Sequence, residues 1–277
     1  MDIYYENSKK EKVYLNKAPF RMLAVNTLFD YEWKHTTKGL SRPQVVKFTK
    51  TMIEKQFDIV VSGADSTEYK ENIRTLLECF DTDISSITKG KLYVGSSYIS
   101  CYIIKSNKAA RYVNTRKSTI SFTLIAENGN WIKEETYSFA RITNEIFESD
   151  GLDYPYDYAF DYANILVNQK LVNTNYASSD FEMTIYGSCE NPVISIGTHT
   201  YSVEVSLITG EFIKINSATK KVYKVKNNGD VINLFDKKGK DFYIFEKIPK
   251  GILNVAWDGG FGFDIKLLSE RSEPEWI

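Results

Sequence analysis

The sequence predicts a mainly β protein with two domains, and three observations carry this prediction. Apolar and polar residues alternate through many short segments, as at Phe57, Ile59 and Val61, and a period of two places one set of side chains on a core face. The aromatic fraction is high at 14%, which suits half-buried pleated surfaces. The chain has 277 residues, whereas a single domain usually spans ~100–200 residues.

A lapse in this alternation marks the expected domain boundary. The pattern is clear up to Tyr137 and becomes poor over the residues that follow it. We therefore expect an α+β first domain, a β-sandwich, over residues 1–140. A tyrosine-rich linker with a first strand near Ile165 would occupy residues 141–175. The second domain, 176–277, shows short strands at the roughly 8–12-residue spacing that is typical of a β-sandwich.

One segment of the first domain has the apolar period of a helix. The stripe consists of residues four, three, one and three positions apart, namely Tyr69, Ile73, Leu76, Leu77 and Phe80. Asp65 is placed to cap the N-terminus, with Glu68 three residues later as its reciprocal partner. We expect one helix near residues 66–80, packed on the sheet whose strand ends near Gly63.

Two strand pairs follow this predicted helix. Residues 90–95 and 98–103 alternate and are separated by Ser96 and Ser97, which indicates a hairpin. Further along, Asn128 and Gly129 lie between two longer alternating segments. Because Asn-Gly is a strong signal for a two-residue turn, we expect those two segments to pair as a second hairpin.

The chain carries no strong catalytic signal. A serine-nucleophile motif of the Gly-x-Ser-x-Gly type is absent from the sequence. The two histidines, His35 and His199, are better explained as surface or core residues than as bases. Cys79 and Cys101 lie on apolar stripes and are expected to be small core side chains. We therefore predict that the protein is not an enzyme, with no catalytic residues.

Metal and cofactor sites are likewise not predicted. The three cysteines, which include Cys189, are far apart and lack zinc-site spacing. Acidic residues recur at Asp150, Asp153, Asp157 and Asp161, but their register is not that of a calcium-binding loop. A glycine-rich stretch at residues 259–262 precedes a strand instead of a helix, so a turn explains it better than phosphate binding does.

The charge and hydropathy of the chain exclude other classes of function. The formal net charge is −1, without the basic excess of a dedicated nucleic-acid binder. No apolar run approaches the ~18 residues of a membrane span. The first residues show no signal-peptide pattern. We therefore expect a protein made in a reducing cytosol, with no membrane partner and no specific nucleic-acid binding.

The order of elements and several short sequence segments resemble those of the distal tail protein, Dit, of bacteriophages with long non-contractile tails. In the first half the matching segments are Gly63, the Glu68-Tyr69-Lys70 helix, GKLYV at 90–94 and YISCYI at 98–103. In the second half they are NPVI at 191–194, GEFIKIN at 210–216, PKGILN at 249–254 and FDIK at 263–266. The resemblance covers nearly the whole chain and rests on the order and spacing of these segments.

This resemblance implies a structural tail component of a phage or prophage, without cofactors. The first domain would be a ring-forming β-sandwich with a helix and a protruding hairpin, and the second a galectin-like β-sandwich. A homo-hexameric ring would join the tail tube protein to the tail-tip hub protein, with a receptor-binding protein as a possible further partner. DNA would pass through the ring, which is located at the tail tip of the virion and made in the host cytoplasm.

Two surfaces follow as candidates. In the ring, the hairpin at 90–106 is the candidate for reaching a neighbouring subunit, with Tyr93 and Tyr98 as interface anchors; alternatively, both tyrosines cover their own sheet. The competing function is a carbohydrate-binding β-sandwich module or adhesin, in which Trp257 and Trp276 offer a stacking platform. Trp257 also continues the alternation of its strand, which favours a place in the core.

Overall fold

The computed structural model describes residues 1–23, 28–39, 41–108, 115–142 and 169–274. The chain divides into two compact units. Unit 1 comprises Met1–Lys133 and Glu270–Ile277, and unit 2 comprises Glu134–Ser269. The chain passes between the units within strand β10 (Trp131–Phe139) and again within β21 (Phe263–Arg271). The predicted linker lies largely outside the described residues, as does the strand near Ile165, so the boundaries at 140 and 175 stay predictions.

Unit 1 contains antiparallel strands that pair in the order β3-β6-β9-β8-β7-β1-β2. The strands are β1 (Ile3–Glu6), β2 (Lys12–Tyr14), β3 (Phe20–Leu23), β6 (Ile53–Ser62), β7 (Gly90–Val94), β8 (Ser97–Lys108) and β9 (Lys117–Ala126). The first half of the long strand β8 pairs with β7 and, through Ser97 and Tyr98, with β10, whereas its second half pairs with β9. The pairing with β9 shifts in register between Ile103 and Lys105, and such irregularities bend a strand.

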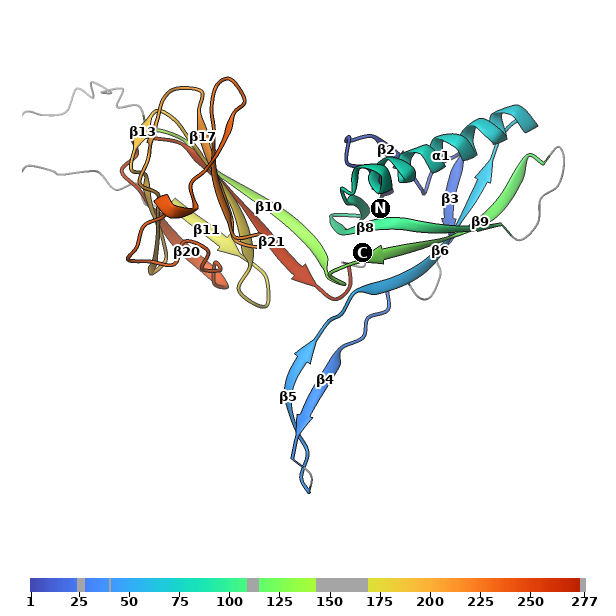
Figure 1. Ribbon diagram of the computed structural model, residues 1–277, viewed down its shortest axis with the longest axis horizontal. Coiled ribbons are helices and arrows are strands. Elements are labelled where there is room, and N and C mark those ends of the chain that lie inside the picture. The colour runs from blue at the N-terminus through green and yellow to red at the C-terminus, as the bar shows by residue number, and fades with distance from the viewer. Residues whose placement is uncertain (24–27, 40, 109–114, 143–168, 275–277) are drawn as a thin grey trace, which may run out of the picture. The chain divides into compact units, whose positions relative to one another are not determined.

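The core of unit 1 confirms the alternation seen in the sequence. Phe57, Ile59 and Val61 of β6 are fully buried, and the alternating residues of β9 from Ile120 to Ala126 are buried as well. The helix α1 (Ser66–Ser86) adds Leu76 and Phe80 to the same cluster. The predicted packing of one helix on the sheet is therefore confirmed (Figure 1).

The helix begins as predicted and ends later than predicted. Asp65 caps it, because its side chain accepts hydrogen bonds from the backbone N–H groups of Thr67 and Glu68. The Glu68 carboxylate accepts from the backbone N–H of Ala64 instead of that of Asp65. Residues 81–86 are poor helix formers, yet the helix continues through them. The reason is tertiary: Asp83 is fully buried and anchors this last turn.

The predicted hairpin at Asn128 and Gly129 is wrong. A turn joins β9 to β10 there, but the two strands do not pair with each other in the described sheet. Both edges of β9 are already used by β6 and β8. The first residues of β10 instead pair with the start of β8, with Ile132 opposite Tyr98.

Unit 2 is a sandwich of two antiparallel sheets. One sheet has the order β19-β18-β17-β12-β21-β10 and the other the order β11-β20-β14-β15. Their bounds are β11 (Gln169–Asn173), β12 (Asp180–Tyr186), β14 (Val193–Ile196), β15 (His199–Ser202), β17 (Phe212–Asn216), β18 (Lys221–Val225), β19 (Val231–Asn233) and β20 (Gly251–Ala256). Unit 2 also contains a short pair, β13 (Cys189–Glu190) with β16 (Ser206–Leu207), and a 3-10 helix, η1 (Phe235–Lys237).

The core of unit 2 lies between these sheets. Met183, Ile213 and Ile265 come from the first sheet, while Ile194 and Val255 come from the second. The mainly β fold with two sandwich-like units and one packed helix is thus the architecture that the sequence predicted.

Candidate interaction surfaces

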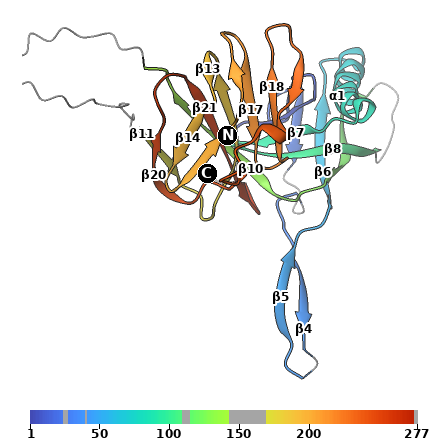
Figure 2. The same cartoon turned by 60° about the vertical axis from the view of Figure 1, so that its left-hand side comes forward.

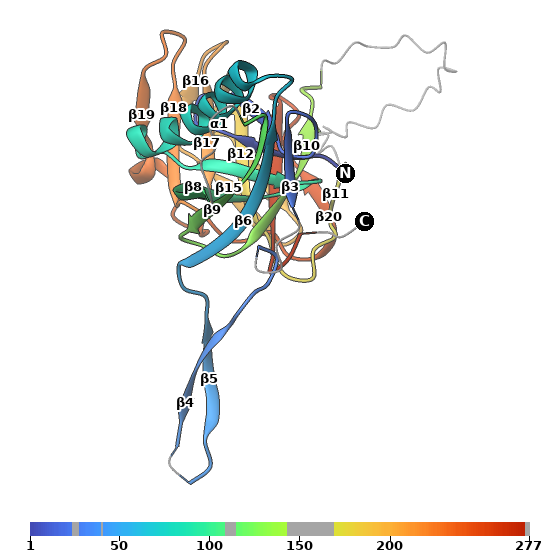
Figure 3. The same ribbon diagram turned by 90° about the vertical axis from the view of Figure 1, so that its right-hand side faces the viewer.

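A hairpin in unit 1 forms a sheet of its own. It consists of β4 (Lys34–Lys38) and β5 (Gln44–Thr49), which pair only with each other among the described strands. We call residues 34–49 the arm. In Figures 1, 2 and 3 the arm leads away from β6 to the bottom of each view, whereas α1 lies at the top of unit 1. The protruding hairpin expected for the first domain is therefore this arm, which the sequence analysis did not locate.

The arm has one apolar face and one basic face. The cross-strand pairs His35–Phe48 and Thr37–Val45 lie on one side of the ribbon, because alternate residues of a strand point to the same side. The other side carries Lys34, Lys38 and Lys47, with polar neighbours. Phe48 is 62% exposed, so this apolar face is not covered by the rest of the chain.

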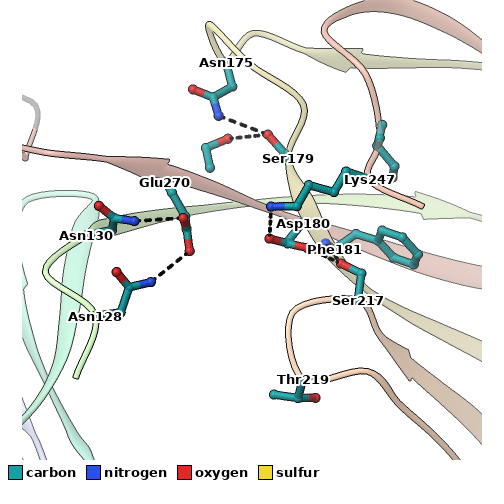
Figure 4. Close-up of polar contacts among 12 residues, drawn as sticks. Asn128, Asn130, Asn175, Ser179, Asp180, Phe181, Ser217, Thr219, Lys247 and Glu270 are labelled. Atoms are coloured by element: carbon teal, nitrogen blue, oxygen red, sulfur yellow. Dashed lines mark hydrogen bonds and ion pairs between the residues drawn. The ribbon is translucent and has the colours of Figure 1, made fainter. Parts of the chain in front are cut away.

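Lys50 anchors the base of the arm to unit 1. Its ammonium donates to Asn130 Oδ1 at 2.5 Å and to Ser272 Oγ at 3.0 Å, and it lies 4.7 Å from the centre of the Trp33 ring. Asn130 in turn donates to Glu270 (Figure 4). Burial lowers the pKa of Lys50, and the charge of Glu270 opposes that shift. This network holds the segments on both sides of the arm.

A row of four tyrosines crosses the sheet of unit 1. Tyr14, Tyr4, Tyr93 and Tyr98 are directly opposite one another on β2, β1, β7 and β8. Tyr4 and Tyr93 stack with ring centroids 4.5 Å apart, and Tyr93 lies 5.2 Å from Tyr98. Lysines cap the row: Lys91 Nζ is 3.9 Å from the Tyr98 ring centre, and Lys17 is 4.6 Å from that of Tyr14. This arrangement is a cation–π ladder on one face of the sheet.

The two predicted interface tyrosines differ in exposure. Both lie on the predicted β7–β8 hairpin, which is confirmed. Tyr98 is only 5% exposed, whereas Tyr93 is half-buried. Tyr14, at the outer end of the row, is the most exposed of the four described here at 41%. The part of Tyr93 that remains open is thus continuous with Tyr4 and Tyr14, and its place in an interface stays a prediction.

The two tryptophans of the alternative glycan platform do not form one surface in the described residues. Trp257 is buried in the core of unit 2, where its indole N–H donates to the Phe261 carbonyl at 3.0 Å. Its ring packs edge-on against Phe139 and Phe263. Trp276 lies outside the described residues. The core interpretation of Trp257 is therefore confirmed.

Unit 2 does offer a shallow cleft elsewhere on its surface. It has a volume of about 590 Å³ and lies along β18 and β19, near η1. Tyr223 and the 42%-exposed ring of Phe235 line it together with the amides of Asn216 and Asn233. Aromatic rings beside amide groups are the side chains that bind sugars by stacking and hydrogen bonding.

Burial makes the three cysteines poor nucleophiles. Burial raises the pKa of Cys79 and of Cys101 to about 12, and that of Cys189 to about 11, which disfavours the reactive thiolate. His35 is exposed on the arm, and His199 Nε2 lies 2.9 Å from the Tyr243 carbonyl oxygen. No cluster of metal-binding side chains occurs in the described residues, and no described helix is long and apolar enough to cross a membrane.

A serine, an aspartate and a lysine do meet in unit 2. Asp180 accepts from Ser217 Oγ at 2.8 Å and from Lys247 Nζ at 2.7 Å (Figure 4). Ser217 Oγ also accepts from the backbone N–H of Phe181. Because Ser217 is only 4% exposed and its hydroxyl already bonds to two residues of β12, this cluster has a structural role and does not present a nucleophile to a substrate.

Sequence reasoning missed the arm because its alternation is irregular. The register shifts between Thr36 and Thr37, which interrupts the period of two. A different signal marks the segment: from residue 33 to residue 53 the sequence contains no Asp or Glu. Its basic residues are Lys34, Lys38, Arg42, Lys47 and Lys50. A segment whose charged residues are all basic and are interspersed with apolar residues is the sequence signal that could have identified this surface.

Comparisons with known proteins bear on the fold. The chain has no match among protein-family models or curated protein sequences. Among solved structures it is similar to the SPP1 Dit (gp 19.1) protein, described as a paradigm of the hub adsorption apparatus in phages that infect Gram-positive bacteria. That match has a TM-score of 0.60 and 10% identity, and covers 98% of each chain.

Two structures of the phage P2 baseplate are similar to the same degree. Both are in the activated conformation, one with Ca and the other with Sr. Each match has a TM-score of 0.60 and 11% identity, and covers 99% of this chain and 100% or 99% of the other. The chain therefore has, over nearly its whole length, the fold of the SPP1 Dit protein.

Proposed function

We propose that this chain is a structural subunit of a phage tail, a distal tail protein that forms a homo-hexameric ring at the tail tip. The observation that carries the proposal is a fold shared from end to end with the SPP1 Dit protein and with phage P2 baseplate chains. A likeness limited to one sandwich would fit many functions. Here both units, in the same order, take part.

In this proposal the ring joins the tail tube protein to the tail-tip hub protein and lets DNA pass. The protein acts by binding and not by catalysis. Two features of unit 1 support assembly: the arm exposes a face that its own chain leaves uncovered, and the tyrosine row offers aromatic contact area. Exposed apolar patches and aromatics of this kind are typical of interfaces.

A mass measurement in solution tests the proposal. The purified full chain should form a closed, concentration-dependent oligomer, visible as rings by negative-stain electron microscopy. Tyr93→Asp should shift rings toward monomers if the open side of the tyrosine row takes part in the contact. A monomer at every concentration, together with no binding to tail tube or hub proteins, would remove the basis of the proposal.

Passage of DNA adds a further expectation. Each lysine or arginine that neutralises a phosphate adds salt-dependent affinity, so a ring that lets DNA slide needs few such contacts in its lumen. We expect weak or undetectable binding of duplex DNA at physiological salt, measured by fluorescence anisotropy. Sub-micromolar binding with a steep salt dependence would contradict a passive channel.

The cleft along β18 and β19 supports carbohydrate binding as a second candidate function. A glycan array separates the two candidates, because a binding module retains a sugar as a monomer. Loss of that signal in a Phe235→Ala variant, with the Val193→Ala variant as an exposed control on β14, would assign the sugar to this cleft.

A further inference from the structure

The arm requires a partner that is not the arm itself. An isolated two-stranded hairpin is marginally stable in water, and this one leaves Val45, Val46 and Phe48 between 50% and 62% exposed. A symmetric contact between two arms would bring together segments that carry only positive charge. Positive charges that are brought close together in this way repel each other. The partner surface should therefore be apolar with acidic surroundings.

Unit 1 contains a second surface with that chemistry. A groove of about 310 Å³ lies between α1 and β8, and its lining is mainly apolar. Its lining includes Leu77 and Ile84 of α1 and Ile104 of β8, together with one acidic residue, Asp81, and one basic residue, Lys105. Ile84 and Ile104 are 43% and 48% exposed. The groove therefore has open apolar side chains on both of its walls.

The helix that forms one wall of this groove carries a negative surface. Its exposed acidic residues and cap are Asp65, Glu68, Glu71, Glu78 and Asp81. Its exposed basic residues are Lys70 and Arg74, and Arg74 is paired with Glu78. Of these acidic residues Asp81 lies in the lining of the groove, and Glu78 precedes it by three residues on α1. Acidic groups at this position complement the arm, and complementary charge steers two surfaces together and sets their orientation.

The arm cannot fill the groove of its own chain in this structure. Figures 1 to 3 show the arm leading away from one end of unit 1 while α1 lies at the opposite end. A second copy of the chain removes this restriction. The contact then joins two different surfaces, and a head-to-tail contact of this kind closes into a ring when the rotation permits.

We propose that the arm of one copy packs its apolar face into the α1–β8 groove of a second copy. This inference rests on the proposed ring and specifies the two surfaces that build it. Phe48 and Val45 enter the groove beside Ile84 and Ile104, while the lysines of the arm lie toward the acidic side chains of α1. Lys50 sets the direction in which the arm leaves its own subunit.

Disulfide trapping tests this contact directly. Phe48→Cys and Ile84→Cys variants are prepared separately in a Cys189→Ser background, since Cys79 and Cys101 are buried. Mild oxidation of the mixture should give covalent dimers several-fold above those from a mixture of Phe48→Cys with Val231→Cys. Val231 is 65% exposed and lies on unit 2, so it reports random collisions.

The outcomes separate this inference from the proposed function. Rings that form while the mixture shows only control levels of cross-link would overturn the arm–groove contact and leave the ring intact. Dimers from Phe48→Cys alone would show arm-to-arm contact and also overturn it. A chain that stays monomeric and uncross-linked contradicts both proposals.

Charge reversal gives an independent test that distinguishes a protein partner from nucleic acid. Lys34→Glu, Lys38→Glu and Lys47→Glu together should lower the assembled fraction, and Glu78→Lys with Asp81→Lys on the same chain should restore it. Restoration supports the pairing of the two surfaces. If the arm variant assembles normally and loses only binding to duplex DNA, the arm binds nucleic acid and the inference is wrong.

Discussion

Two of the hairpins of unit 1, β7–β8 and the arm, are both antiparallel pairs but have opposite surroundings. In β7–β8, Leu92 and Ile99 are buried under α1 while Tyr93 and Tyr98 lie on the other face. In the arm, β4–β5, both faces are exposed apart from Thr49 at its base. The first hairpin is held by the core of its own unit. The second gains little from its own chain, and its exposed apolar residues are the basis of the proposed contact with a second chain.

The largest expected effect comes from the buried hairpin. Leu92 is fully buried in the core of unit 1, and Leu92→Ala should lower the free energy of unfolding by ~2–5 kcal/mol, because a core cavity is left. Denaturant titration of the full chain measures this. Val45→Ala on the arm is the matched control and should change stability by less than about 0.5 kcal/mol. Equal losses in the two variants would erase the contrast between the hairpins.

A smaller loss is expected where the end of α1 is tied to β1. The Tyr5 hydroxyl donates to Asp83 at 2.6 Å, and the backbone N–H of Ser8 donates to the same carboxylate. Tyr5→Phe leaves one buried carboxylate oxygen without its donor and should cost ~1–3 kcal/mol. Denaturant titration gives the magnitude, and amide exchange should show faster opening of residues 81–86. Unchanged exchange there would mean that Asp83 does not hold the last turn.

A pH-dependent effect of about 1 kcal/mol or less is expected at Glu6 of β1, beside β7. Burial raises the pKa of Glu6, but the hydrogen bond and charge of Lys10 and the charge of Lys12 outweigh it, so the pKa lies below its ordinary 4.5. A carboxyl group with a lowered pKa stabilises the fold above its ordinary pKa, and this contribution disappears as pH falls through the lowered value.

The Glu6→Gln variant measures that contribution. Wild type should exceed the variant in unfolding free energy at pH 6, and the difference should shrink toward zero as the pH falls well below 4.5. Parallel stability curves over that interval would show that the lysine contacts of Glu6 contribute nothing measurable.

The smallest effect on stability is expected on the arm itself. Phe48→Ser removes an aromatic ring that is 62% exposed, so the monomer should keep its unfolding free energy within about 0.5 kcal/mol. Association should fall in the same variant, as measured by sedimentation over a range of concentrations. A loss of stability well beyond ~1 kcal/mol would show that Phe48 packs on its own chain, and this would contradict our explanation of the arm.

The local sequence pattern was sufficient to predict which side chains are buried wherever a helix or strand packs one face on one core. Phe57, Ile59 and Val61 alternate in the sequence and are fully buried. Asp65 caps α1 as its position predicts, and Gly210, Gly229 and Gly259 occupy turns with positive φ, which glycine adopts without steric cost. The candidate surfaces were harder to predict, because Tyr93 and Tyr98 alternate alike and yet differ in exposure.

The sequence by itself therefore determined the fold class, the start of the helix and the faces of most strands. Only the tertiary structure decided which strands pair, since hydrogen bonds between strands join residues that are distant in the chain. That is why β10 pairs with β8 and not with β9 across Asn128 and Gly129. The tertiary structure also decided that α1 continues to Ser86, because Tyr5 and Ser8 satisfy Asp83 from another part of the unit. The exposure of the arm was also decided by the tertiary structure. No periodic signal in the sequence shows that a segment has no core to pack on, because burial depends on what surrounds the segment.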